Sequence, residues 1–181
     1  MSKLLILTVC YGNIHRSVVA ERSLQQALDV HELSHQVSVM SRGLQGFRNE
    51  PLPKGRNIVD YPEVWASVQP VAIELGLDLC HHRARPLDED IVARASLILA
   101  MDTRVMWEHP LSITKVFPQY AYKALLYSEL AGVAESMTDA FEDRSTSIIE
   151  FTRRIHEIAH CHIHRAVELA RALNRSKSAQ S

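Results

Sequence analysis

A cysteine and an arginine six residues apart, Cys10 and Arg16, are the residues whose types and spacing most clearly suggest chemistry. Between them, Gly12 and Asn13 can adopt backbone angles that most residues avoid, so this stretch can curl its N–H groups inward around an anion. A thiolate is a nucleophile, and the planar guanidinium of Arg16 can hold two phosphoryl oxygens at once. Ser17 follows, and its hydroxyl could help the sulfur leave an intermediate. The segment predicts phosphomonoester hydrolysis through a cysteine nucleophile.

The elements expected on either side of this segment suit an anion site. Residues 4–9 form a continuous apolar run, typical of a parallel strand covered on both faces. Residues 17–30 place apolar side chains on one helical face, and a helix start offers free N–H groups to an anion. The same spacing also arises by chance, with Cys10 as a buried apolar residue and Arg16 as a surface charge. The strand, the Gly-Asn pair and the helix together favour a phosphate loop at residues 10–17.

Short apolar runs alternate with helical stretches along the rest of the chain. We expect strands at residues 35–40, 95–101 and 121–127, a loop at 42–61, and helices at 68–75, with Pro70 in the first turn, at 87–94 and at 103–108. A long last helix carries a stripe at seven-residue spacing, formed by Ile148, Ile155, His162 and Leu169. This order predicts one α/β domain over residues 1–174, in which helices flank a four-stranded parallel sheet and the phosphate loop joins the first strand to the first helix. Residues 175–181 are expected to be a polar C-terminal tail.

Composition narrows the class of protein. The chain has 181 residues, of which 46% are apolar and 23% charged, and its net charge of −1 gives no general attraction to nucleic acid or to a membrane. The short apolar run at residues 4–9 leads into the phosphate loop without a cleavage site, so a secretion signal is not expected. The three cysteines, Cys10, Cys80 and Cys161, are an odd number at wide spacing, which implies no disulfide framework and favours a cytoplasmic location.

Several segments resemble the low-molecular-weight protein tyrosine phosphatases in order and spacing along nearly the whole chain. Residues 9–17 with Ala20-Glu21 closely resemble the family signature, and Ser41-Arg42-Gly43 is similar to its Ser-Ala-Gly. Residues 82–87 and 96–102 resemble two further family segments. The resemblance implies a cytoplasmic enzyme that hydrolyses phosphotyrosine in a protein substrate through a phosphocysteine. It also implies that no metal or organic cofactor is needed, and we expect a monomer or weak dimer.

The resemblance also implies roles for individual residues. Cys10 corresponds to the nucleophile, and Arg16 closes the loop around the phosphate. Asp139 corresponds to the general acid, although the proline that usually follows is missing and Asp143 is a rival. The residues matched to phosphate and substrate contacts are Tyr11, Gly12, Asn13, Ile14, His15 and Ser17. Of the remaining matches, Ser41 and His82, like Asn13 and Ser17, would brace the loop, and Asp102 would line the rim or cap a helix.

Substrate choice is expected to depend on the wall of the pocket. Tyr11 and Ile14 match family positions that face the leaving group, and a bulky Ile is similar to tyrosine-directed members, whereas a Thr is associated with arginine phosphatases. Phe47 and Phe141 could form the walls of a slot for an aromatic ring, or they could simply anchor their loops.

Departures from the family pattern keep other functions open. His15 replaces a cysteine that in many members pairs with the nucleophile, and Val18 replaces a proline. An arsenate reductase would need two further cysteines to relay a disulfide, and none follows the third expected strand. Arg42 in place of alanine and the missing proline would also suit a catalytically weak phosphopeptide-binding regulator.

The last helix has a further feature. Its histidines His156, His160 and His164 have a spacing that could bind a metal, but no second motif supports this. His162, on the apolar stripe, is expected in the core.

Overall fold

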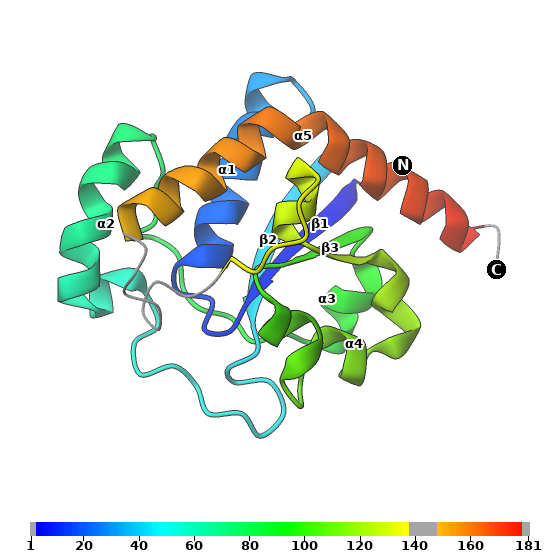
Figure 1. Cartoon of the computed structure of the whole chain (residues 1–181), viewed down its shortest axis with the longest axis horizontal. Helices are drawn as coiled ribbons and strands as arrows, with labels where there is room; N and C mark the ends of the chain where they lie inside the picture. Colours follow the sequence, from blue (N-terminus) through cyan, green and yellow to red (C-terminus); the bar gives the residue numbers. More distant parts are fainter. Residues whose placement is uncertain (1–2, 138–147, 179–181) are drawn as a thin grey trace.

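The computed structural model describes residues 3–137 and 148–178, and a parallel sheet lies at its centre (Figure 1). The strands are β1 (Leu4–Cys10), β2 (Val37–Gly43), β3 (Leu97–Ala100) and β4 (Ala124–Leu126). Their order in the sheet is β2-β1-β3-β4, and every neighbouring pair is parallel. The predicted α/β fold with a four-stranded parallel sheet is therefore confirmed.

Helices cover both faces of the sheet. The helices α1 (Arg16–Val30) and α5 (Ile148–Ser178) pack together over one face, with α2 (Pro62–Glu74) beside α5 (Figure 1). The short helices α3 (Glu89–Arg94) and α4 (Ile113–Val116) lie on the other side. Short helical turns at Ile58–Asp60, Arg104–Glu108, Pro118–Lys123 and Tyr127–Ala131 complete the connections. No helix of the described ranges is both long enough and apolar enough to cross a membrane.

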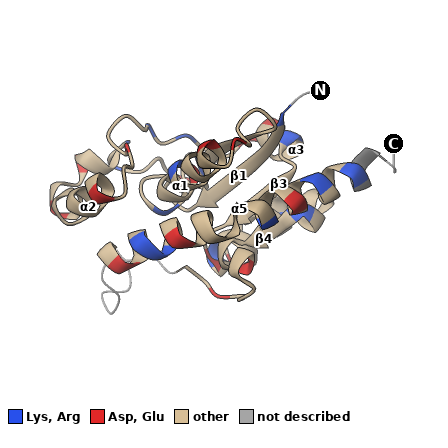
Figure 2. Ribbon diagram, turned by 90° about the horizontal axis from the view of Figure 1, so that it is seen from above, with Lys and Arg blue, Asp and Glu red and all other residues tan. Residues whose placement is uncertain are grey.

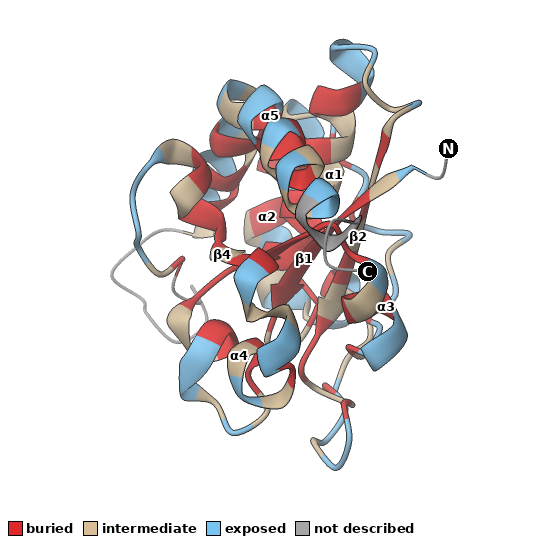
Figure 3. Cartoon of the chain, turned by 90° about the vertical axis from the view of Figure 1, so that its right-hand side faces the viewer, coloured by how far each residue is buried: buried red, intermediate tan, exposed pale blue. Residues whose placement is uncertain are grey.

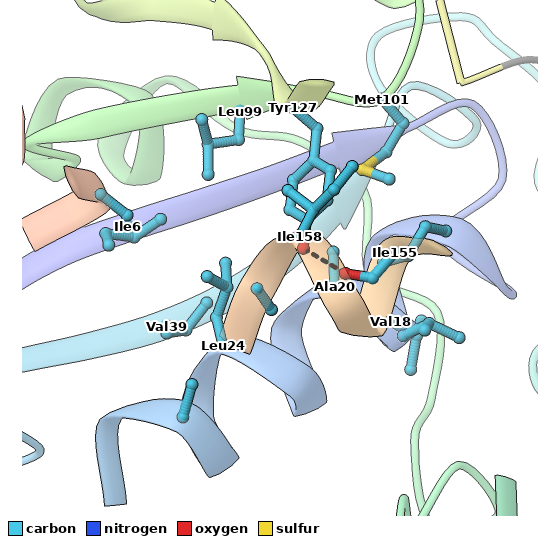
Figure 4. Close-up of a cluster of buried hydrophobic side chains, with 14 of the residues drawn as sticks. Ile6, Val18, Ala20, Leu24, Val39, Leu99, Met101, Tyr127, Ile155 and Ile158 are labelled. Atoms are coloured by element: carbon cyan, nitrogen blue, oxygen red, sulfur yellow. Dashed lines mark hydrogen bonds between the residues drawn. The ribbon is translucent and has the colours of Figure 1, made fainter. Parts of the chain in front are cut away.

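Successive residues of each strand feed two separate cores, because side chains alternate between the faces of a sheet. On the α1 and α5 face, Ile6 and Leu99 meet helix residues such as Leu24 and Ile155 (Figure 4). The hydroxyl of Tyr127, fully buried there, donates to the carbonyl oxygen of Ile155 at 2.8 Å. Leu5, Leu7 and Val9 point to the opposite core. This alternation places Cys10 on the face where α1 begins.

Burial follows the same layers. Buried residues fill the strands and the inward faces of the helices, and exposed ones cover the outside (Figure 3). Acidic and basic residues alternate along the exposed side of α5 (Figure 2). The sequence-based strands at 95–101 and 121–127 were predicted too long, since β3 and β4 have only four and three residues.

Helix α2 corrects one prediction. It begins at Pro62 rather than near residue 68, so Pro70 lies inside the helix. Pro62 suits the first turn because its missing N–H would have no partner there. Pro70 lies on the exposed side, where water can satisfy the carbonyl that loses its partner, so this proline no longer marks a helix start.

Helix α5 corrects another. It extends from Ile148 through Ser178 but is not one regular helix, because it kinks at His162, which has non-helical angles (φ −123°, ψ 19°) and is only partly buried. Ile163 occupies the core instead. The kink changes the direction of the helix at His162, so a strict seven-residue stripe does not continue unbroken along the core face.

Candidate active site

The phosphate loop joins β1 to α1 at the carboxyl edge of the sheet. Asn13 adopts a left-handed conformation (φ 54°), which turns the loop back toward the sheet. The loop also passes very close to the end of β2, where a side chain on Gly43 would approach the backbone N of Asn13 and the carbonyl of Tyr11 to 2.9 Å. Only glycine leaves room at residue 43, and this explains the glycine of the Ser-Arg-Gly sequence that ends β2.

Cys10 lies at the base of the loop and is 3% exposed. Its Sγ accepts from the backbone N–H of Asn13 at 3.2 Å and lies 3.0 Å from Ser17 Oγ. Both contacts stabilise negative charge on the sulfur. The sulfur is reached through a pocket of about 120 Å³, whose lining includes the loop.

A chain of hydrogen bonds fixes the direction of the Ser17 hydroxyl. The carboxylate of Glu21 can only accept, so Ser41 donates to it and must accept from Asn13 Nδ2 at 2.9 Å. Asn13 Nδ2 also donates to Ser17 Oγ at 3.0 Å. The hydrogen of Ser17 is therefore free to point at Cys10. Glu21, at the other end of this series of hydrogen bonds, therefore determines which group donates at each step.

The other end of the Asn13 amide is held equally firmly. Its Oδ1 accepts from His82 Nε2 at 3.1 Å and from the backbone N–H of Arg85 at 2.9 Å. His82 is therefore the neutral tautomer with hydrogen on Nε2. Burial, followed by repulsion from Arg22, lowers the pKa of His82 to about 4. The structure thus brings together the four residues expected to brace the loop. They are Asn13, Ser17, Ser41 and His82.

Arg16 is buried at the opening of α1 and is oriented by two acceptors. Its Nη1 donates to the carboxylate of Asp102, just after β3, and to the carbonyl oxygen of Met137 at 2.9 Å. Asp102 also accepts from the backbone N–H of Val105 at 2.7 Å. Asp102 therefore caps the turn that follows, one of the two roles expected of it, and it does not line the pocket but holds the guanidinium of Arg16 beside it.

His15 connects the loop to α5. Thr152 Oγ1 donates to the carbonyl oxygen of Ile148 at 2.8 Å, so it accepts from His15 Nε2 at 3.0 Å. His15 is 3% exposed and lines the pocket. The side chain that replaces a cysteine therefore anchors the loop to the last helix.

The rim of the pocket is formed by Tyr11 and its neighbours. The phenol of Tyr11 donates to Glu50, and the guanidinium of Arg104 lies 4.0 Å above its ring. His109 packs edge-on against the same ring, with centroids 5.6 Å apart. Burial, and then the bond to Glu50, raise the pKa of Tyr11 above its ordinary value, so the phenol stays protonated.

The walls differ in part from those expected. Ile14 lines the pocket, together with Gln45 and Tyr61, which sequence reasoning missed. Phe47 does not line it, because its ring packs against Phe117 in the opposite core with centroids 5.6 Å apart. Phe47 therefore serves as a loop anchor, the second interpretation considered above.

Some expected residues lie beyond the described ranges. Asp139, Phe141 and the rival acid Asp143 fall within residues 138–147, outside the described residues. Met137, which accepts from Arg16, precedes Asp139 by two residues, and its N–H donates to the carbonyl oxygen of Met101, the residue after β3, at 2.8 Å.

The histidines of α5 have protein partners. His156 Nδ1 lies 3.2 Å from Ser23 Oγ, His160 Nε2 lies 3.1 Å from Gln26 Oε1, and the ring of His164 packs on His31. Among the described residues, no three His, Cys, Asp or Glu side chains are grouped as metal ligands would be. These histidines therefore join α5 to α1.

Comparisons with known proteins identify the family. A family model for low molecular weight phosphotyrosine protein phosphatase matches residues 5–175. The probable low molecular weight protein-tyrosine-phosphatase EpsP of Ralstonia nicotianae is 33% identical over 120 residues, which are 62% of this chain and 68% of that protein. The low molecular weight protein-tyrosine-phosphatase Etp of Escherichia coli is 30% identical over 143 residues, covering 76% and 82% of the two chains.

A solved structure shows the same relationship. The crystal structure of a low molecular weight protein tyrosine phosphatase from T. tengcongensis superposes with a TM-score of 0.63 at 25% identity, covering 92% of this chain and 99% of that one. The family model spans nearly the whole chain, including the loop that holds Cys10 and Arg16. The chain belongs to the low molecular weight protein tyrosine phosphatase family.

Proposed function

We propose that this protein hydrolyses phosphotyrosine in protein substrates through a phosphocysteine on Cys10. The observation that supports this most directly is the position of Cys10 Sγ at the base of the pocket, where it accepts from the Asn13 N–H and lies 3.0 Å from Ser17 Oγ. A sulfur held by donors in this way is both a nucleophile and a stable leaving group.

In the first step, the Cys10 thiolate attacks phosphorus in line with the tyrosyl oxygen. A sulfur–phosphorus bond forms as the phosphorus–oxygen bond breaks, and the tyrosyl oxygen takes a proton from Asp139. The inward N–H groups of the loop and the guanidinium of Arg16 hold the three equatorial oxygens, on which charge is spread in the transition state. Asp102 keeps the guanidinium of Arg16 oriented, while the other N–H groups of that guanidinium turn to the phosphoryl group.

In the second step, water attacks the phosphocysteine. The carboxylate of Asp139, now deprotonated, takes a proton from that water as an oxygen–phosphorus bond forms and the sulfur–phosphorus bond breaks. The sulfur leaves as a thiolate, and the hydroxyl of Ser17 donates to it. Inorganic phosphate is then released and the site is restored.

The walls of the pocket support an aromatic substrate. Tyr61 and Tyr11 offer ring surface, and Ile14 offers a branched apolar side chain beside the loop. A flat ring is long enough to carry the phosphate down to Cys10 between such walls. These contacts support phosphotyrosine over the shorter phosphoserine and phosphothreonine.

The alternative functions gain no support. Disulfide relay in an arsenate reductase needs other cysteines near the nucleophile, but Cys80 and Cys161 are exposed and do not line the pocket. A binding regulator would not require the hydrogen-bond chain from Glu21 to Ser17 that directs a hydroxyl at the sulfur.

Hydrolysis of p-nitrophenyl phosphate tests the proposal. We expect turnover by the wild type and none by Cys10→Ser, while Cys10→Ser keeps its affinity for vanadate because the loop amides and Arg16 remain. The exposed Cys80→Ser is the matched control and should keep full activity. Residual activity of Cys10→Ser within tenfold of wild type would show that another group is the nucleophile.

A further inference from the structure

A second pocket lies on the outer side of the Asn13 network and shares no lining residue with the pocket over Cys10. Its volume is about 230 Å³. Four arginines line it: Arg22 from α1, Arg42 from β2, and Arg83 and Arg85 from the segment that follows α2. The one carboxylate in the lining is Glu21, and it already accepts from Ser41.

The positive charge of this pocket is only partly offset. Asp88 lies 3.9 Å from Arg42 Nε, and Asp78 is paired with His81 at the outer edge. Arg22 Nε is buried and has no hydrogen-bond partner among the described residues. Repulsion from Arg22, Arg85 and Arg42 also contributes to the low pKa of His82 at the inner wall.

We propose that this pocket binds a phosphate dianion, either inorganic phosphate or the phosphate group of a small molecule. Guanidinium groups pair with phosphate oxygens through parallel charge-assisted hydrogen bonds, and four arginines line this pocket. The volume equals that of roughly eight water molecules, which leaves room for a substituent on the phosphate. An anion in the pocket would offset the repulsion among the arginines that line it.

The pocket also touches the hydrogen bonds that hold the phosphate loop. Ser41 and His82 are part of its lining, and each binds the side chain of Asn13. An anion in the pocket therefore contacts both supports of the residue that donates to Cys10. The site is distinct from the catalytic pocket, and its occupancy does not depend on the hydrolytic reaction.

NMR titration with inorganic phosphate, at constant ionic strength set by chloride, measures both sites in one sample. The amides of Gly12 and Ile14 report the phosphate loop, and the amide of Arg83 with the imidazole of His82 reports the second pocket. We expect two different dissociation constants in the Cys10→Ser protein. Removing one charge-assisted contact should weaken the second site by about tenfold or more.

Three variants locate the site. In Arg22→Gln and in the exposed Arg83→Gln, the constant reported by the second pocket should rise about tenfold while the loop constant stays within about twofold. The matched control is Arg175→Gln, an exposed arginine on α5 whose loss should change neither constant. Arg83→Gln keeps the test valid if Arg22→Gln disturbs α1.

The same titration distinguishes the two sources of the phosphate. Glycerol phosphate, added to the Cys10→Ser protein, should bind the second pocket more tightly than inorganic phosphate if a small organic phosphate is the ligand, and no more tightly if free phosphate is. The proposal is overturned if the second pocket's signals do not move. It is also overturned if those signals report the same dissociation constant as the loop amides in Cys10→Ser alone and in both arginine variants.

Discussion

Acid should weaken the fold through His82, the imidazole that supports Asn13. Its pKa is about 4 in the folded protein and about 6.5 when exposed in the unfolded chain. Between these values the unfolded state binds more protons, so stability falls as the pH is lowered. The contribution is fully present above about pH 6.5 and is lost progressively down to about pH 4.

The size of the effect follows from the two pKa values. Linkage with one site gives a loss of about 2 kcal/mol between pH 7 and pH 5, and about 3 kcal/mol once pH 4 is reached. His82 is partly buried, so solvent screens some of this effect and these figures are upper bounds.

Urea unfolding of wild type and His82→Gln at pH 7, 6 and 5 measures it. Glutamine can still donate to Asn13 Oδ1, but it does not titrate. The variant should therefore lose less stability than wild type between pH 7 and pH 5, by up to about 2 kcal/mol. The exposed His35→Gln controls for general effects of replacing an imidazole. Parallel pH profiles for wild type and His82→Gln would refute the reasoning.

Four further predictions concern the catalytic pocket. Asp139→Asn should lower kcat on phosphotyrosine by about 10²-fold, and less for a leaving group that hardly needs a proton; a larger loss in Asp143→Asn would move the general acid by four residues. Ile14→Thr should gain activity on phosphoarginine in a peptide assay, whereas equal kcat/KM for phosphoserine and phosphotyrosine in the wild type would contradict the slot. Asn13→Ala removes four hydrogen bonds and leaves alanine, which tolerates the left-handed region less well than asparagine, at φ 54°. The free energy of unfolding measured with urea should fall by about 2–4 kcal/mol, and a fall below about 0.5 kcal/mol would show that the network does not support the loop. Peroxide should oxidise Cys10 to sulfinic or sulfonic acid that dithiothreitol does not reverse, and full recovery with a Cys10–Cys80 disulfide in the mass spectrum would contradict this.

The sheet and the loop could be predicted because their signals are local. The apolar run before Cys10 predicts a buried strand, and the alternation of strand side chains then fixes the face on which the sulfur lies. Asn13 tolerates the left-handed conformation that the turn requires, and the structure shows it there, whereas Gly12 does not have a positive φ. Such features depend on near neighbours in the chain, so a single sequence contains them.

The walls of the pocket and the supports of the loop depend on contacts between distant segments. Tyr61 lies in a connection whose path no local pattern defines, and Phe47 could equally face a slot or a core. Gln45 follows β2, and parallel strands end at the same edge, so that position offered a usable signal. Glu21 resembles an ordinary surface residue of α1 until Ser41 is seen to donate to it. The stripe through His162 failed because the helix kinks there, which a heptad pattern does not reveal.

The most direct test of the account is to trap the covalent intermediate. The enzyme is mixed with a phosphotyrosyl peptide, quenched within milliseconds and digested, and the peptide that contains Cys10 is weighed. The account predicts one phosphoryl group on Cys10, more of it in Asp139→Asn with a leaving group that needs no proton, and none in Cys10→Ser. Turnover with no phosphoryl group on Cys10 at any quench time, or with the group on a different residue, would contradict it.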